Sequence, residues 1–340
     1  MLPFTRHLSR PLLALLLPLS VATAQAAPDI AKDNAGSIKG QTQVVIAEFG
    51  VEFYTQIHAQ GRAGGASAAI TTHLVGVSDA SLQAITDQAY ADTVSALTAA
   101  GFQVMDSAAL QSQPIYQELA GKYGQPAPFL FSDGSIVDSQ PSLSRIFAPA
   151  GMKVFIASGK ARGDLRQRID VQNQARGDRE GELAKAVGAT LLHVNYLVSF
   201  GETSATKNGL LAGIAGKARV SIDAKPLLVA EETQIQFVTS AGKRTFTNSK
   251  RPRHTGAVYL DEPLVSPVAD LFALTETTTA ETKRADGMFN AVGSLLGSSA
   301  AEKNKANEVA VSNEDNYRST YQALIGEAAT ALVGTLAANR

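Results

Sequence analysis

The sequence predicts an α/β protein with a mixed central sheet, helices on its faces, antiparallel strands in the C-terminal half and a closing C-terminal helix. Three patterns support this prediction. Apolar and polar residues alternate over 43–57, which is typical of a long strand. A helical pattern over 79–100 leads into a short strand at 102–105, which completes a strand–helix–strand unit. Apolar residues recur at helical spacing over 315–338, which predicts a last helix that docks on the sheet.

The first 26 residues have the pattern of a secretory signal peptide. Arg6 and Arg10 lie in a basic segment, residues 12–17 are apolar, and Ala24-Gln25-Ala26 places small residues at a cleavage position. The apolar run is far shorter than the ~20 residues that a membrane-spanning helix needs. We therefore expect the mature chain to begin near Ala27 and to be periplasmic or secreted.

A hairpin and a helix are predicted after this leader. Residues 27–42 are polar and contain glycine, so we expect a flexible segment there. The strand at 43–57 is followed by a glycine-rich turn and by a second strand at 68–77, which predicts the hairpin. Ser78 is suited to cap the next helix, and Gly101 is suited to end it.

The middle of the chain is less regular. A helix that Pro114 interrupts is expected over 107–123. Proline and glycine punctuate 124–152, which we interpret as a loop-like insertion. A short apolar strand at 153–157 and a polar helix at 164–187 are expected to follow it.

The clearest strand of the second half covers 190–200. Leu192, Val194 and Tyr196 share one apolar face, and His193 and Asn195 lie on the other face, which we expect to be more exposed to water. Strand-like stretches within 217–260 predict an antiparallel series. Residues 265–310 are weakly patterned and are expected to be helical in places.

Composition limits the class of protein. The chain has 340 residues, of which 45% are hydrophobic, so 43–340 is interpreted as a single α/β domain with its own core. It has no cysteine, which excludes disulfides, cysteine–zinc sites and thiol nucleophiles. The net charge of −1 becomes −3 without Arg6 and Arg10 of the leader. This acidic balance argues against a nucleic-acid partner.

Three stretches resemble a known family: Val44-Val45-Ile46-Ala47-Glu48-Phe49, the segment 97–105 around Ala100-Gly101-Phe102, and the segment 184–194 around Gly188-Ala189. With the closing helix, they are similar to the periplasmic α/β domain of the curli-secretion lipoprotein (CsgG) family and related outer-membrane assembly factors. The family's lipid-bearing cysteine is missing, and no pair of long pore hairpins is evident. The resemblance implies an exported scaffold or assembly protein of the cell envelope rather than a catalyst.

No motif identifies a catalytic residue, a cofactor or a metal site. Glu48 and Glu52 share one side of the first strand and lie ~13 Å apart, beyond the spacing of a glycosidase carboxylate pair, so we interpret them as a solvated strand face. His193 is interpreted as a sheet residue with satisfied hydrogen bonds. Ser204-Ala205-Thr206-Lys207 matches the S-x-x-K motif of penicillin-interacting enzymes, but it follows a strand and lacks the partner motifs, so we take it as a chance match.

The candidate binding surface combines a basic cluster with an apolar glycine-rich connection. Both are suited to an anionic membrane surface or to an envelope protein partner. The expected binding residues are Lys243, Arg244, Lys250, Arg251, Arg253, Leu210, Leu211 and Ile214. The sequence therefore favours an exported, non-catalytic binding protein. A hydrolase whose site is assembled from distant residues, and a periplasmic carrier of a lipid or small ligand, remain alternatives.

Overall fold

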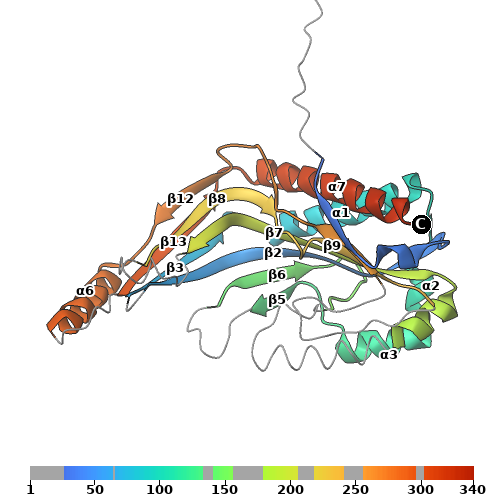
Figure 1. Cartoon of the computed structure of the whole chain (residues 1–340), viewed down its shortest axis with the longest axis horizontal. Coiled ribbons are helices and arrows are strands. Elements are labelled where there is room, and N and C mark those ends of the chain that lie inside the picture. The colour runs from blue at the N-terminus through green and yellow to red at the C-terminus, as the bar shows by residue number, and fades with distance from the viewer. Residues whose placement is uncertain are drawn as a thin grey trace, which may run out of the picture.

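The computed structural model describes residues 27–63, 66–132, 141–155, 179–205, 218–240, 256–295 and 302–340. Within these residues the chain forms one mixed sheet of 13 strands with helices packed against it, including a closing C-terminal helix (Figure 1). The predicted α/β class is therefore confirmed. No helix among the described residues is both long and apolar enough to span a bilayer.

The longest strand, β2 (Gln43–Ala63), organises the sheet. Its first half pairs in parallel with β7 (Thr190–Ala205), and its second half pairs antiparallel with β3 (Ala66–Val75). The predicted hairpin is thereby confirmed. A β-bulge between Ile46 and Glu48 shifts the register of β2 against β7, so that Glu48 lies opposite His193.

Neighbouring strands follow the order β1-β10-β9-β7-β2-β3-β13-β12. The predicted antiparallel series in the second half is present, because β8 and β9 both pair antiparallel with β7. The remaining strands are β1 (Ile30–Asp33), β4 (Gln103–Val104), β5 (Phe129–Ser132), β6 (Leu143–Phe147), β8 (Val220–Leu228), β9 (Gln234–Val238), β10 (Gly256–Leu260), β11 (Leu264–Val265), β12 (Phe272–Glu276) and β13 (Glu302–Val311).

The sheet divides into two layers at Val198. Up to that residue β7 pairs with β2, and beyond it β7 pairs with β8, whereas β2 continues with β3. The layers pack through a small apolar cluster made of Ile57, Ile70, Phe200, Ile222 and Val309. We call this part the sheet extension: the strands β3, β12 and β13, β2 from Gln56 onward, and β7 and β8 on the far side of Val198. It projects beyond helices α1 (Asp79–Ala99) and α7 (Glu314–Ala338), as Figure 1 shows.

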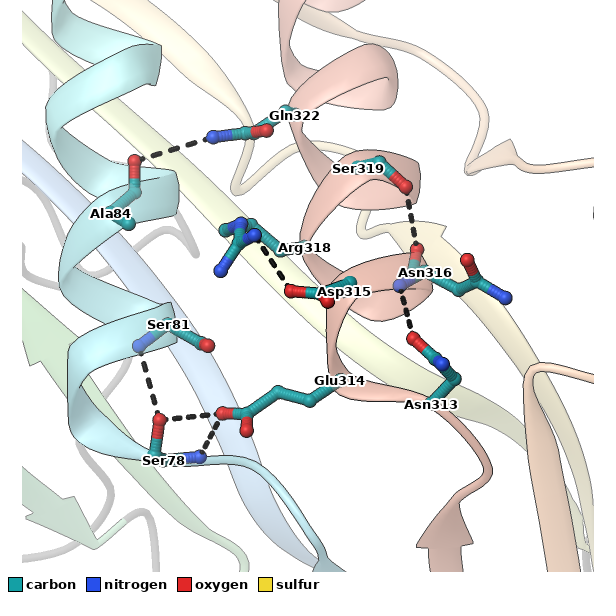
Figure 2. Close-up of polar contacts among 10 residues, drawn as sticks. All are labelled: Ser78, Ser81, Ala84, Asn313, Glu314, Asp315, Asn316, Arg318, Ser319 and Gln322. Atoms are coloured by element: carbon teal, nitrogen blue, oxygen red, sulfur yellow. Dashed lines mark hydrogen bonds and ion pairs between the residues drawn. The ribbon is translucent and has the colours of Figure 1, made fainter.

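Helices α1 (Asp79–Ala99) and α7 (Glu314–Ala338) pack together over one face of the sheet (Figure 1). The expected caps of α1 are confirmed, because the Ser78 hydroxyl accepts from Ser81 N and Gly101 has a φ of +84°. The two helix starts are joined, since Glu314 Oε1 accepts hydrogen bonds from Ser78 N at 2.7 Å and from Ser78 Oγ at 2.5 Å (Figure 2). A second contact, from Gln322 Nε2 to the Ala84 carbonyl, lies further along the pair.

The opposite face of the sheet is also covered. Helices α2 (Ser107–Gln111), α3 (Pro114–Tyr123) and the helical residues 179–187 surround a second apolar cluster that includes Leu191. On the face of β7 expected to be more exposed to water, His193 is therefore buried, whereas Asn195 is partly exposed. The expectation of a half-exposed strand was wrong for His193, because periodicity along one strand cannot show what covers its second face.

The structure departs from the sequence expectations in four segments. Part of the expected flexible leader, β1, pairs with β10. The loop-like insertion contains the β5–β6 pair, and β6 joins the edge of β2. Of the expected strand at 153–157, residues 156 and 157 lie outside the described residues, and the described part forms an isolated bridge between Val154 and Gln125. The weakly patterned region 265–310 holds β12 and β13 as well as the helix α6 (Ala280–Leu295).

Candidate functional site: a basic groove and an apolar helix

All eight residues of the expected binding surface lie in 206–217 and 241–255, outside the described residues. The described residues beside these segments are at opposite ends of β7. Ala205 pairs with Val220 at the end of the sheet extension, whereas Val238, the last residue of β9, pairs with Leu191 near the start of β7. Fourteen residues separate Leu191 from Ala205 along the strand, which corresponds to about 45 Å.

A basic groove lies between the two layers of the sheet extension and has a volume of about 560 Å³. One wall comes from β3 and β13, and the other comes from β7 and the start of β8. Lys303 and Lys305 line it together, because alternate residues of a strand point to the same side. Its lining residues are Ala68, Ala69, Ser204, Ala218, Arg219, Val220, Ser221, Lys303 and Lys305. Three cations and no acid are thus found among the described residues of the groove.

The charges of the groove are linked to helix α6. Lys305 Nζ lies 3.5 Å from Glu276 Oε2, and Lys283 Nζ of α6 lies 3.1 Å from Glu276 Oε1. The Lys283 ammonium lowers the pKa of the exposed Glu276 carboxyl below its usual value, and this keeps the bridging group ionised. In the part of the chain that the structure describes, Lys303 has no carboxylate within ion-pair distance.

Helix α6 lies at the end of the sheet extension (Figure 1). Its Asp286 carboxylate accepts from Asn304 N at 2.8 Å and from Asn304 Nδ2 at 2.9 Å, so α6 is held against β13 through a residue that alternates with Lys303 and Lys305 of the groove. Three large apolar side chains of α6 are exposed: Met288 by 70%, Phe289 by 49% and Val292 by 55%. Their spacing places them on one side of the helix. An exposed group of this kind indicates an interaction surface.

This arrangement is suited to binding anionic groups. Lysine and arginine attract phosphate and carboxylate groups, and the hydroxyls of Ser204 and Ser221, 2.8 Å apart, add hydrogen-bonding capacity at the groove wall. The described lining contains no histidine or carboxylate that could act as a general acid or base. The hydroxyl of Ser204, the first residue of the S-x-x-K sequence, contacts Ser221 of the neighbouring strand. Lys207, the last residue of that sequence, lies outside the described residues.

The other residues examined in the sequence occupy buried or structural positions. Glu52 is buried and accepts from Ser144 Oγ at 2.7 Å, so the expectation of a solvated face was wrong for this residue. Glu48 is largely covered as well, since its side chain is only 14% exposed. Two further histidines lie in the β2–β3 hairpin. His58 Nδ1 is 2.9 Å from Thr71 Oγ1, and His73 lies opposite Gln56 in the strand register.

Sequence reasoning missed the residues that form the groove and the apolar side of α6. Lys303 and Lys305 are two residues apart, the spacing expected of a strand with one basic face. The surrounding region is otherwise weakly patterned, so this signal alone did not predict the strand. Met288, Phe289 and Val292 have helical spacing within an otherwise polar stretch, and this was the available signal for α6. Comparison of the chain with protein-family models, with curated proteins and with solved structures finds no match.

Proposed function

We propose that this is an exported envelope protein that acts by binding, and that the end of its sheet extension docks on an anionic membrane surface. One observation carries the proposal. Met288, Phe289 and Val292 are exposed on α6, which is hydrogen-bonded to β13, the strand that presents Lys303 and Lys305 to the groove. Apolar side chains can enter the boundary between headgroups and acyl chains while neighbouring cations contact lipid phosphates.

The position of this surface favours docking. Figure 1 shows α6 beyond the part of the sheet that α1 and α7 cover, so a flat surface can reach it without contact with the helical layer. An acidic protein would account for the groove, but it would not by itself require the exposed apolar side of α6. The signal-peptide pattern of residues 1–26 supports export.

The two alternative functions have less support. A carrier needs a large dry cavity, whereas the two larger hollows among the described residues, of about 560 and 630 Å³, are open to the surface, and the cavities around His193 measure only about 30 and 10 Å³. A hydrolase needs converging titratable groups in a pocket that admits a substrate. Glu48, Glu180 and His193 do converge, but the described cavities beside them have room for one or two water molecules only.

Co-sedimentation with vesicles tests the proposal. The wild-type chain is expected to bind vesicles that contain phosphatidylglycerol and not vesicles of phosphatidylcholine. Each cation at an anionic surface contributes ~1 kcal/mol, so changing Arg219, Lys303 and Lys305 together to Gln should weaken binding roughly 100-fold. Added salt should weaken it as well, because it screens exposed charges.

Matched variants locate the surface. Changing Lys32, Lys39 and Lys153 to Gln removes the same charge from exposed positions elsewhere and should leave vesicle binding unchanged. Changing Met288, Phe289 and Val292 to Ser should reduce the binding that remains at high salt, because it removes the apolar contribution. Circular dichroism and thermal unfolding show that each variant is folded.

Two results would overturn membrane docking: no binding of the wild type to anionic vesicles, or equal binding by the wild type and the groove variant. The five-residue variant of Lys243, Arg244, Lys250, Arg251 and Arg253 to Gln tests the sequence-predicted surface in the same assay. Export is tested separately, by N-terminal sequencing of protein from an envelope fraction, where we expect Ala27 as the first residue.

A further inference from the structure

Three residues with metal-binding side chains meet on the face of the sheet that α2 and α3 cover, far from the groove. Glu48 comes from β2, His193 comes from β7, and Glu180 comes from the helical residues 179–187. The β-bulge after Ile46 creates the meeting, because two residues of β2 then lie opposite one residue of β7 and Glu48 becomes the partner of His193. Bulges commonly redirect a side chain in this way.

The distances fit the geometry of a metal-binding histidine. Glu48 Oε2 lies 3.1 Å from His193 Nδ1, which is within hydrogen-bond distance. Glu180 Oε2 lies 3.6 Å from His193 Nε2, longer than a hydrogen bond but close to the ~3.4 Å that separates two ligands of a tetrahedral zinc ion. One ligand atom from each of the three residues lies within 4.8 Å of the others.

Burial makes the cluster suitable for an ion. The side chain of Glu180 is 3% exposed, that of His193 is 5% exposed and that of Glu48 is 14% exposed. Two carboxylates close together in such surroundings are stabilised by a cation, since burial of like charges is costly. A cavity of about 10 Å³ is lined by all three residues and has room for one water-sized occupant. A second cavity of about 30 Å³ adjoins Glu48 and His193.

We propose that His193 and Glu180 bind one divalent transition-metal ion and that Glu48 orients His193 for it, with Zn²⁺ as the best match. The ion lies between Nε2 of His193 and the Glu180 carboxylate, and water from the adjoining cavity completes its coordination. Glu48 is a positioning residue that accepts the Nδ1 hydrogen of His193, an arrangement common among metal-binding histidines. Imidazole together with carboxylate, and without a thiolate, suits Zn²⁺ better than Mg²⁺ or Ca²⁺. This site is independent of the proposed membrane docking.

Binding of Zn²⁺ to the purified, untagged full chain tests the proposal after treatment with a chelator. Isothermal titration should show one ion per chain, and Zn²⁺ should raise the thermal midpoint. His193→Gln and Glu180→Gln should each weaken binding by at least about 100-fold. Glu48→Gln, which keeps an oxygen acceptor for Nδ1, should weaken binding by about 10- to 100-fold. Co²⁺ in place of Zn²⁺ should give a visible absorption band that His193→Gln removes.

Two control variants make the result specific. Glu182→Gln changes an exposed carboxylate two residues after Glu180, and His73→Gln changes an exposed histidine of the hairpin. Both should bind Zn²⁺ as the wild type does. Absence of saturable Zn²⁺ binding by the wild type would overturn the proposal and leave a metal-free ion-pair network. Wild-type affinity in folded Glu48→Gln and Glu180→Gln variants would overturn it equally, even if His193→Gln failed to fold.

Discussion

Replacing Leu191 by alanine tests whether β7 is buried on both faces. Leu191 and Leu192 are consecutive, and both are fully buried. Leu192 belongs to the apolar cluster beneath α1 and α7, whereas Leu191 belongs to the separate cluster beneath α2 and α3. The two side chains are chemically identical and differ only in the layer that they contact. If the second layer is packed as tightly as the first, Leu191→Ala should cost as much as Leu192→Ala.

The expected cost follows from burial. Removing a leucine side chain from a packed core destabilises a protein by about 3 to 5 kcal/mol, which includes the lost transfer free energy and the remaining cavity. For a chain of 340 residues, the entropy of unfolding converts this cost into a fall of about 4 to 7 °C in the thermal midpoint. A leucine on a half-exposed face would cost far less, because a partly open site leaves no closed cavity.

Thermal and urea unfolding of the full chain, followed by circular dichroism, provides the measurement. The denaturation midpoint should fall by similar amounts in the two variants, with an unchanged dependence on urea concentration. A large loss in Leu192→Ala together with a shift below about 1 °C in Leu191→Ala would refute the reasoning. It would mean that α2, α3 and the helical residues 179–187 do not form a packed second layer.

Two further predictions concern the helical layer. The Ser78 amide and hydroxyl lower the pKa of Glu314 from 4.5 to about 2, so Glu314 stabilises the fold above pH 4.5 and loses this contribution as the pH falls to 2. Glu314→Gln should therefore be less stable than the wild type at pH 7 in urea unfolding, and a difference that persists at pH 2 would contradict the assignment. Tyr321→Phe removes the donor to the Ser199 carbonyl, a buried hydrogen bond of 2.6 Å, and should cost about 1 to 3 kcal/mol. Tyr317→Phe is the matched control and should be nearly neutral, because its hydroxyl has no partner among the described residues; equal losses would argue against the Tyr321 contact.

Local signals in the sequence determined the elements whose stability depends on nearby residues. The β2–β3 hairpin follows from alternation and a glycine-rich turn. The start of α1 follows from the Ser78 cap, its end follows from Gly101, and α7 follows from the spacing of its apolar residues. These elements could be predicted because turns, caps and helical periodicity are determined by residues that lie close together along the chain.

Pairing between distant segments determined the elements that the sequence did not reveal. β1 becomes a strand by pairing with β10, and β13 by lying between β3 and β12. β6 becomes a strand within a proline- and glycine-rich region because it reaches the open edge of β2. Such strands are stabilised largely by pairing with their neighbours, so their own composition carries little information.

The candidate sites depended on tertiary structure even more strongly. Arg219 and Lys303 are far apart in the sequence and meet only because the two layers of the sheet extension pack together. Glu48 and His193 meet because a bulge shifts β2 by one residue, and the helical residues 179–187 then bring Glu180 over them. The sequence determined which side chains were available and the fold class that holds them. Register, layer packing and helix placement decided which side chains came together, because these arise from contacts between segments that no local pattern records.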